Sequence, residues 1–392
     1  MKAYRKQLST PWVSCIWPNE TNGTERGVGV SNMEKRSYHV EALRFILAAV
    51  IVLYHILHSA IIPYTGEASD TYNRYAQLTD SASLLVQCFL VMGGYYLYGT
   101  LKKKPAFWSF LTGRFIRLWP VLAFSVLILV LTGYESFEDA FLDMFMLRAT
   151  GLSLSWRGII WYIGPFFWCS VLIGGLFSCM SHSKATVLVC TLSWIGYGIS
   201  VNYLHGGLGR DTIWSWLSLA MVNVFGGLTL GMVCRMLQEA VRRKKARFSS
   251  KMKLMRFSLV SIFEISYCIY LFMVVLLNKG VPKNKLVFTL LFALFFAVFS
   301  CGEGFLSKAM NNRILGLCGK YSYCIYMMQQ ISFYVMMRTI WVWFPQEILL
   351  HPKLMLLLST IISILFGIGT YYVVEKPALV FWKKHTLLHI AQ

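Results

Sequence analysis

The sequence contains few charged residues and is especially short of acidic ones. Only 14% of its 392 residues are charged, with 17 Asp and Glu against 37 Lys and Arg, whereas about 25% of an ordinary soluble domain is charged. The hydrophobic share is 57%, and the mean hydropathy is +0.57. These proportions exclude a soluble enzyme, a disordered tail protein and a disulfide-stapled secreted module.

The sequence also lacks the motifs of metal, redox and nucleic-acid sites. Its ten Cys are scattered, mostly within apolar runs, and none forms a CxxC pair. We interpret them as small buried apolar residues and expect no metal site. No DNA- or RNA-binding motif accompanies the formal charge of +20, and in so apolar a protein this excess indicates membrane topology and anionic lipids. We therefore expect membrane lipids and no nucleic acid as partners.

Long apolar runs dominate the chain, and ten of them are long enough to cross a bilayer, which needs roughly 20 helical residues. They predict an all-α polytopic membrane helix bundle of about ten transmembrane helices. The bundle occupies 38–380, after a poorly ordered N-terminal tail (1–37) and before a C-terminal tail (381–392). The predicted spans are 42–62, 81–99, 118–133, 159–180, 186–204, 214–234, 257–277, 285–301, 321–343 and 354–374.

The distribution of basic residues predicts the orientation. With both termini in the cytoplasm, the inside segments carry 27 Lys and Arg and the outside segments carry 9. This bias follows the positive-inside rule. We therefore predict that both tails are cytoplasmic. Between the third and fourth spans, Phe137, Phe141, Met144 and Phe145 share one helical face, which predicts a short helix on the outer surface.

Two ionisable residues of the first span attract attention because charge within a span costs at least about 2.5–3.5 kcal/mol. Arg44 and His55 are eleven residues apart. Eleven helical steps make three turns plus about 20° and roughly 16 Å of rise, so the two side chains share a face. Periodicity alone leaves two interpretations open. The pair is either a charged pocket entrance leading to a buried imidazole, or an Arg reaching headgroups and a His bonded to another helix.

Further charges occur at other spans. Arg114 and Arg117, at i and i+3, point the same way at the cytoplasmic start of the third span. Two guanidinium groups on one face suit phosphate binding, and positive-inside anchoring is the alternative. Glu264 lies within the seventh span, with an Arg, or a Ser or Tyr hydroxyl, as its expected partner.

Six short motifs follow one another along the chain, each occurring once. They are Glu41-Ala42-Leu43-Arg44 with Tyr54-His55, Phe89-Leu90-Val91-Met92-Gly93-Gly94-Tyr95, Arg114-Phe115-Ile116-Arg117-Leu118-Trp119-Pro120, Trp161, the stretch Leu317 to Gln329, and Glu375-Lys376-Pro377. This ordered set, over about 38–380, resembles acyltransferase family 3, the bacterial integral-membrane acyltransferases. Among the departures from the family's pattern, Gly93 replaces a Ser, Phe166 replaces a frequent carboxylate, and the ninth-span stretch carries one inserted residue and has Gln329 in place of a His.

The resemblance implies an O-acetyltransferase that moves an acyl group, most often acetyl, from acyl-CoA to a hydroxyl of a cell-envelope carbohydrate. Acyl-CoA would be a donor substrate, since no permanently bound cofactor is implied, and an envelope glycan or lipid-linked sugar the acceptor. Arg44, Arg114 and Arg117 would meet the donor's phosphates from the cytoplasm. The catalytic candidates are His55 and Arg44, and His55 would act as general base or as transient acyl carrier.

The remaining candidates have smaller expected roles. Ser322 and Tyr323 could supply an oxyanion donor, although packing hydroxyls are the commoner case, and Gln329 is a further supporting candidate. The resemblance implies a multi-pass protein of the bacterial plasma membrane. The alternative is a transporter or flippase for acyl groups or lipid-linked sugars, which buried charges and ten spans also suit.

Overall fold

The computed structural model describes residues 37–57, 82–152, 160–204, 212–214, 217–244, 250–277, 279–280, 282, 285–343 and 350–382. The predicted tails, 1–37 and 381–392, lie outside these ranges except for residues 37, 381 and 382. Their predicted lack of order and their side of the membrane therefore stay predictions.

Each of the ten predicted spans contains a helix. The ten are α2 (Tyr38–Ile56), α5 (Ala82–Leu101), α6 (Phe107–Leu131), α8 (Ile163–Cys179), α9 (His182–Leu204), α10 (Leu219–Lys244), α11 (Ser250–Leu277), α12 (Lys285–Phe299), α15 (Ser322–Arg338) and α18 (Pro352–Thr370). Within the described ranges, eight helices are long and apolar enough to cross a membrane. The other two, α12 and α15, have 15 and 17 residues. The predicted all-α polytopic bundle is confirmed, and the chain is a multi-pass membrane protein.

Short elements connect the long helices. They are α7 (Phe137–Met144), η3 (Ile160–Tyr162), the strands β1 (Thr212–Trp214) and β2 (Leu217–Ser218), α13 (Phe305–Ala309), α14 (Arg313–Cys318), η5 (Gly319–Tyr321), α16 (Ile340–Trp343) and the π-helical turn η6 (Tyr371–Glu375). The two strands pair antiparallel over a few residues. So small a ladder leaves the fold class unchanged.

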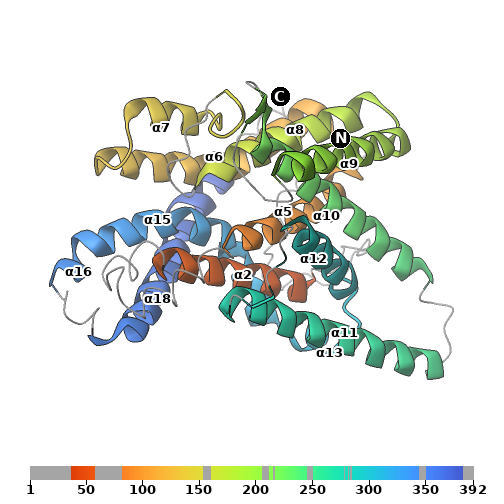
Figure 1. Cartoon of the computed structure of the whole chain (residues 1–392). Coiled ribbons are helices and arrows are strands. Elements are labelled where there is room, and N and C mark those ends of the chain that lie inside the picture. Colours follow the sequence, from red (N-terminus) through yellow and green to blue (C-terminus); the bar gives the residue numbers. More distant parts are fainter. Residues whose placement is uncertain are drawn as a thin grey trace, which may run out of the picture.

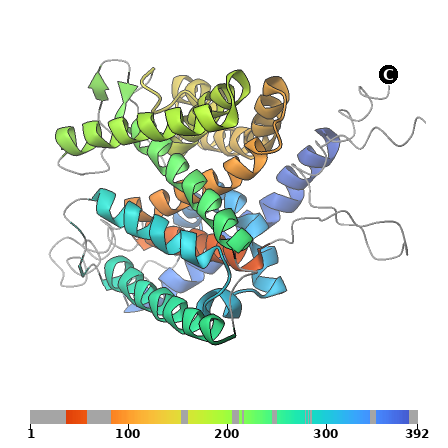
Figure 2. The same ribbon diagram turned by 90° about the vertical axis from the view of Figure 1, so that its right-hand side faces the viewer.

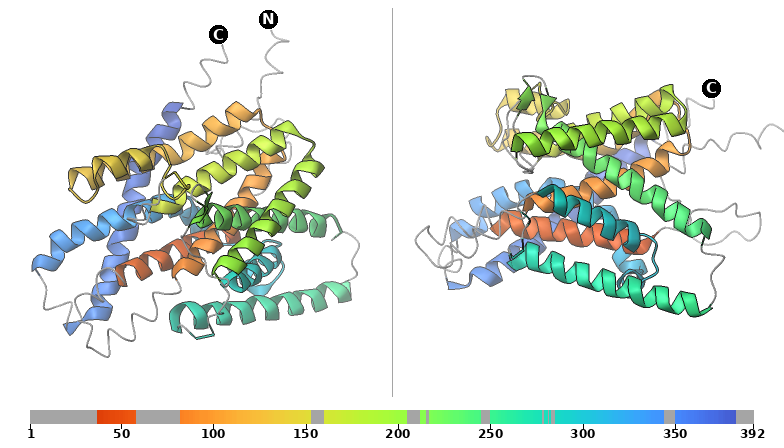
Figure 3. Two further views of the ribbon diagram at one scale, coloured as in Figure 1. Left: turned by 45° about the horizontal axis from the view of Figure 1, so that its top comes forward. Right: turned by 45° about the vertical axis from the view of Figure 1, so that its right-hand side comes forward.

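The long helices form two layers joined by a crossing pair. Helices α6, α7, α8 and α9 lie on one side, α2, α11 and α12 lie on the other, and α5 and α10 cross between them (Figures 1, 2 and 3). Contacts agree with this arrangement, because α10 packs against α5, α8, α9 and α12, and α2 packs against α5, α14, α15 and α18. The first helix of the bundle is therefore surrounded by other helices.

Helix α6 begins earlier than the hydropathy pattern indicates. The third span was predicted at 118–133, but the helix begins at Phe107. Arg114 and Arg117 therefore lie inside the helix rather than at its start. The two arginines lower the mean hydropathy of the first turns of α6, but the helix continues through them. Their side chains line a cavity, so they can be charged within the helix without facing lipid.

The crossing pair α5 and α10 touches backbone to backbone. A Cβ on Gly94 would overlap the carbonyl oxygen of Leu228, and a Cβ on Gly231 would overlap that of Val91. Only glycine permits such a close approach at these two positions. One side of α5 is consequently fixed against α10.

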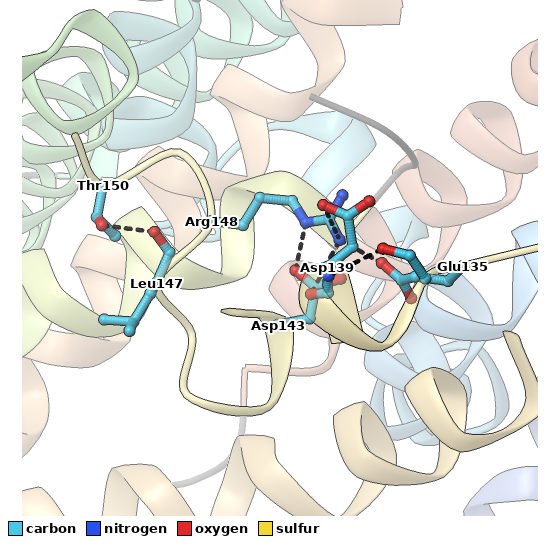
Figure 4. A network of polar contacts seen from close by, with 7 residues as sticks. Glu135, Asp139, Asp143, Leu147, Arg148 and Thr150 are labelled. Atoms are coloured by element: carbon cyan, nitrogen blue, oxygen red, sulfur yellow. Dashed lines mark hydrogen bonds and ion pairs between the residues drawn. The ribbon is translucent and has the colours of Figure 1, made fainter. Parts of the chain in front are cut away.

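Helix α7, predicted from its apolar face, turns its polar face inward. Phe137, Phe141 and Phe145 are 82%, 60% and 57% exposed, while carboxylates from this segment surround the buried guanidinium of Arg148 (Figure 4). Asp143 Oδ1 accepts a hydrogen bond from Arg148 Nε at 2.6 Å, Asp139 Oδ1 lies 3.8 Å from Nη2, and Glu135 pairs with Nη2 as well. The cluster ties α7 to the end of α6, and the exposed rings suit contact with lipid.

The carboxylates around Arg148 outnumber its single positive charge. Burial and the neighbouring Glu135 carboxylate outweigh Arg148 and raise the pKa of Asp143 to about 8. Folding therefore retains a proton near Asp143 that the unfolded chain, with an ordinary Asp pKa of 3.8, has already released at neutral pH.

The close contact of α5 and α10 predicts opposite effects of alanine at two glycines of α5. Gly94→Ala should destabilise the protein, because its methyl group overlaps a backbone carbonyl, by about 1–3 kcal/mol or more. Gly99→Ala, the matched control, has nothing within 4 Å of its Cβ and should be neutral or stabilising by up to about 1 kcal/mol. Thermal unfolding in detergent measures both, and equal melting temperatures for the two variants would contradict the contact.

The raised pKa of Asp143 predicts a pH dependence of stability. Because the folded state holds a proton that the unfolded state has lost, stability should fall as pH rises from about 4 to about 8, by at most about 1.4 kcal/mol per pH unit, and level off above 8. Asp143→Asn keeps an acceptor oxygen for Arg148 and should flatten this slope. Melting temperatures of both proteins between pH 5 and pH 9 test this; parallel profiles would refute it.

Candidate active site

A cavity of about 450 Å³ opens where α2, α5, α6, α8 and α15 meet, at the end for which the distribution of basic residues predicts a cytoplasmic position. Its volume is in the range typical of small-molecule sites. The basic and acidic residues that line it are Arg44, Lys103, Lys104, Arg114, Arg117 and Glu41. Five positive side chains thus line the cavity with one negative side chain, and this excess of positive charge favours an anion.

Arg44 is held in place from three directions. Its Nη2 donates a hydrogen bond of 2.5 Å to the carbonyl oxygen of Gly319 in η5, and its Nη1 lies 3.4 Å from Glu41 Oε2. Glu41 in turn accepts a hydrogen bond of 2.9 Å from the Tyr96 hydroxyl, and the Tyr96 ring centre is 5.8 Å from the Arg44 guanidinium. Arg44 therefore presents a fixed, half-neutralised charge to the cavity.

Arg117 is also paired with a carboxylate. Its Nη2 lies 3.8 Å from Oε1 of Glu375, which is buried in η6 and also accepts a hydrogen bond of 2.9 Å from Cys324 Sγ. The π-helical turn at Tyr371–Glu375 brings this carboxylate inward. Such turns are frequent at functional sites. The closing Glu-Lys-Pro motif thus supplies the counter-charge of the third-span motif.

Arg114 differs from its two neighbours. Among the described residues, no carboxylate lies within ion-pair distance of it, and its guanidinium lies 5.5 Å from the ring centre of Phe110. Arg114 is partly buried, lines the cavity and shares its helix face with the like-charged Arg117 three residues further on. A partly buried cation that lacks a partner is costly, so this position favours an anion from outside the chain.

The far end of the cavity is apolar and aromatic. Tyr162 and Tyr326 meet edge to face with ring centres 4.7 Å apart, and Phe166 lies one turn of α8 beyond Tyr162 at 6.4 Å. Phe89, Leu90, Met92, Gly93 and Ile163 complete this lining. The cavity is therefore amphiphilic: Lys103, Lys104 and Arg114 lie toward one end and the rings of Tyr162, Phe166 and Tyr326 toward the other, with Arg44 close to Tyr162.

His55 lies on the same continuous helix as Arg44 but is not among the residues that line the cavity. It is partly buried and sits eleven residues, or about 16 Å, beyond Arg44 along α2. The shared face that the spacing predicts is retained by the unbroken helix. The catalytic role of His55 stays a prediction.

Of the four supporting candidates, Ser322, Tyr323 and Gln329 lie on α15 and Glu264 lies on α11. Ser322 and Tyr323 line the cavity, but both hydroxyls are donated to backbone carbonyls, Ser322 to Gly319 at 2.9 Å and Tyr323 to Leu118 at 2.6 Å. Gln329 is buried deeper in α15, with neither amide atom hydrogen-bonded to any residue that the structure describes. It is not part of the lining either.

Glu264 lies away from the cavity. It is fully buried, and its Oε2 accepts a hydrogen bond of 3.1 Å from the backbone N–H of Ser307, near the start of α13. The expected partners were an Arg or a hydroxyl. A backbone donor takes that place because Gly304 lets the carboxylate approach the first turn of α13.

Sequence reasoning missed three tyrosines of the site: Tyr96, Tyr162 and Tyr326. Aromatic residues within apolar spans are indistinguishable from core or interfacial residues by pattern alone. The stretch Ser322-Tyr323-Cys324-Ile325-Tyr326 belongs to the family-like motif from Leu317 to Gln329, and this was the one available signal for Tyr326. Tyr96, which holds Glu41, had none.

A family comparison agrees with this geometry. A family model described as an acyltransferase domain matches residues 37–372, which include every helix that lines the cavity. The chain therefore belongs to acyltransferase family 3, and it is a membrane acyltransferase. Searches of curated proteins and of solved structures returned no match.

The unequal pairing of Arg114 and Arg117 predicts opposite changes in stability. Without ligand, Arg114→Gln should raise the melting temperature, because it removes a partly buried charge that has no carboxylate partner among the described residues. Arg117→Gln should lower it by roughly 1 kcal/mol, because the buried Glu375 loses its cation. Arg313→Gln, on an exposed residue outside the cavity, is the control and should stay within about 0.5 kcal/mol. A fall in both cavity variants would show that Arg114 is already neutralised.

Proposed function

We propose that this protein moves an acyl group, in the simplest case acetyl, from acyl-CoA to a hydroxyl of a cell-envelope carbohydrate at the bacterial plasma membrane. The observation that carries the proposal is the geometry at Arg114, which has no carboxylate partner among the described residues and lies beside Arg117 in a cavity that Lys103 and Lys104 also line. The phosphates of CoA supply the missing negative charge. Guanidinium groups bind phosphate with two parallel hydrogen bonds, which favours arginine at such a site.

The two ends of the cavity match the two ends of the donor. With its phosphates among the basic side chains, an extended acyl-CoA brings its thioester toward the rings of Tyr162, Phe166 and Tyr326. Apolar walls exclude water there, which protects a thioester from hydrolysis. The acceptor's hydroxyl oxygen bonds to the acyl carbon, the carbon–sulfur bond breaks, and the hydroxyl proton ends on the released CoA thiol.

His55 is proposed as the group that handles this proton or that carries the acyl group between the two steps. A neutral imidazole can accept the hydroxyl proton as the bond to carbon forms, a contribution of about 10²–10⁴ to the rate. As an acyl carrier it would take the group from the thioester and pass it to the acceptor. In both cases the acceptor approaches from the region of α2 beyond Arg44.

Binding and transfer measured separately test this proposal. For purified full-length protein in nanodiscs, Arg114→Gln should raise the Kd of CoA about 10–100-fold, as expected for a lost charge-assisted hydrogen bond, whereas Arg313→Gln should leave it unchanged. His55→Ala should lower the transfer of labelled acetyl groups from acetyl-CoA to an envelope glycan fraction about 10²–10⁴-fold. Its Kd for CoA should change little, because His55 lies outside the cavity lining.

Three results would count against the proposal. Absence of CoA binding by the wild-type protein would remove the donor assignment. Equal CoA affinity in Arg114→Gln would remove the role of that residue. Wild-type transfer by His55→Ala would remove the catalytic assignment of the imidazole.

A further inference from the structure

Two residues of the cavity lining, Gly93 on α5 and Phe166 on α8, fit together at its aromatic end. A Cβ on Gly93 would lie 2.7 Å from Cε2 and 3.2 Å from Cζ of Phe166, which is closer than side chains normally pack. The phenyl ring therefore occupies space that any larger residue at position 93 would need. Both positions are also departures of this chain from its family's pattern, and they meet in the folded protein.

A larger residue at position 93 cannot gain space by a shift of α5 away from the Phe166 ring. The neighbouring Gly94 packs directly against the backbone of Leu228, and Gly231 packs against the backbone of Val91. Helix α5 is thus held against α10 on its other side. Any conflict between position 93 and Phe166 has to be relieved at the Phe166 side chain itself.

Phe166 lies well inside the cavity, away from its basic end. Phe110, over which Arg114 lies, packs against Gly174 of α8. Phe166 is eight residues before Gly174 on the same helix, which corresponds to about 12 Å. Helix α8 therefore runs from the level of Phe110 and Arg114 to Phe166, and a ligand anchored at Arg114 can extend along it toward the Phe166 ring.

We infer that Phe166, seated against Gly93, limits the length of the acyl chain that the donor may carry. This inference rests on the proposed function, because it requires the phosphates of acyl-CoA at the basic end. The acyl group then extends toward the ring, which offers an apolar wall and no ionisable group. A short acyl group fits in front of the ring, and each added methylene has to displace it.

The inference predicts a change of selectivity with little change in CoA affinity. In an apolar pocket, one methylene more or less changes discrimination about 10–200-fold. Phe166→Ala should therefore lower the ratio of the Kd of hexanoyl-CoA to that of acetyl-CoA at least about 10-fold, while the Kd of CoA itself stays within about threefold. Thioether analogues of both donors, titrated into the full-length protein in nanodiscs, give these constants without turnover. Phe177→Ala, on the same helix outside the lining, is the matched control and should leave the ratio unchanged.

A second pair of variants tests the fit to Gly93. Gly93→Ser should weaken acetyl-analogue binding and lower the melting temperature, because the hydroxymethyl group meets the ring. Adding Phe166→Ala should restore much of both, so that the two changes are strongly non-additive. Independent, additive effects would overturn the contact between the two positions. Phe166→Leu replaces Phe166→Ala in all measurements if the alanine variant does not fold.

The outcomes separate this inference from the function beneath it. If the wild-type protein binds no CoA, the proposed function fails and the inference fails with it. If the wild type and the Phe166 variant bind CoA equally but keep the same hexanoyl-to-acetyl ratio within about twofold, the chain-length role is wrong and the proposed function stands.

Discussion

A positive charge without a counter-charge organises the site of this protein. Arg44 pairs with Glu41 and Arg117 pairs with Glu375, so their charges are partly neutralised within the chain. Arg114 faces Arg117 and an aromatic ring, and the described part of the chain offers it no carboxylate. In the poorly solvated interior of a helix bundle, such an arrangement favours binding of an anion over the empty state. The paired arginines fix geometry, and the unpaired one supplies affinity.

The cavity combines this basic region with an aromatic region about two turns of helix away, which is the arrangement that an amphiphilic donor would require. The same polarity separates recognition from chemistry. Under the proposed function, phosphates would be recognised near the membrane surface, while the reactive bond would lie among rings that exclude water. His55 lies further along α2 than any lining residue of that helix, so it would belong to the acceptor side of this division rather than to the donor cavity.

The sequence predicted those features that depend on local periodicity. Apolar runs marked the helices, and the eleven-residue interval placed Arg44 and His55 on one face, because both follow from the geometry of a single helix. Contacts between distant helices were out of reach. Nothing in the pattern shows that Glu375 meets Arg117, that Glu264 accepts from the backbone of α13, or that Gly93 leaves room for Phe166. The early start of α6 was missed because hydropathy treats a cavity-facing arginine as a residue outside the membrane.

The π-helical turn at the end of α18 determines the direction in which the carboxylate of the closing motif points. A regular α-helix rotates about 100° with each residue, and a single extra residue in the turn shifts everything after it by about that amount. Glu375 is the last residue of this wider turn, so its inward direction depends on how the helix is wound and not only on which amino acid stands there. Two chains could share the same Glu-Lys-Pro letters and yet differ in whether the carboxylate reaches an arginine.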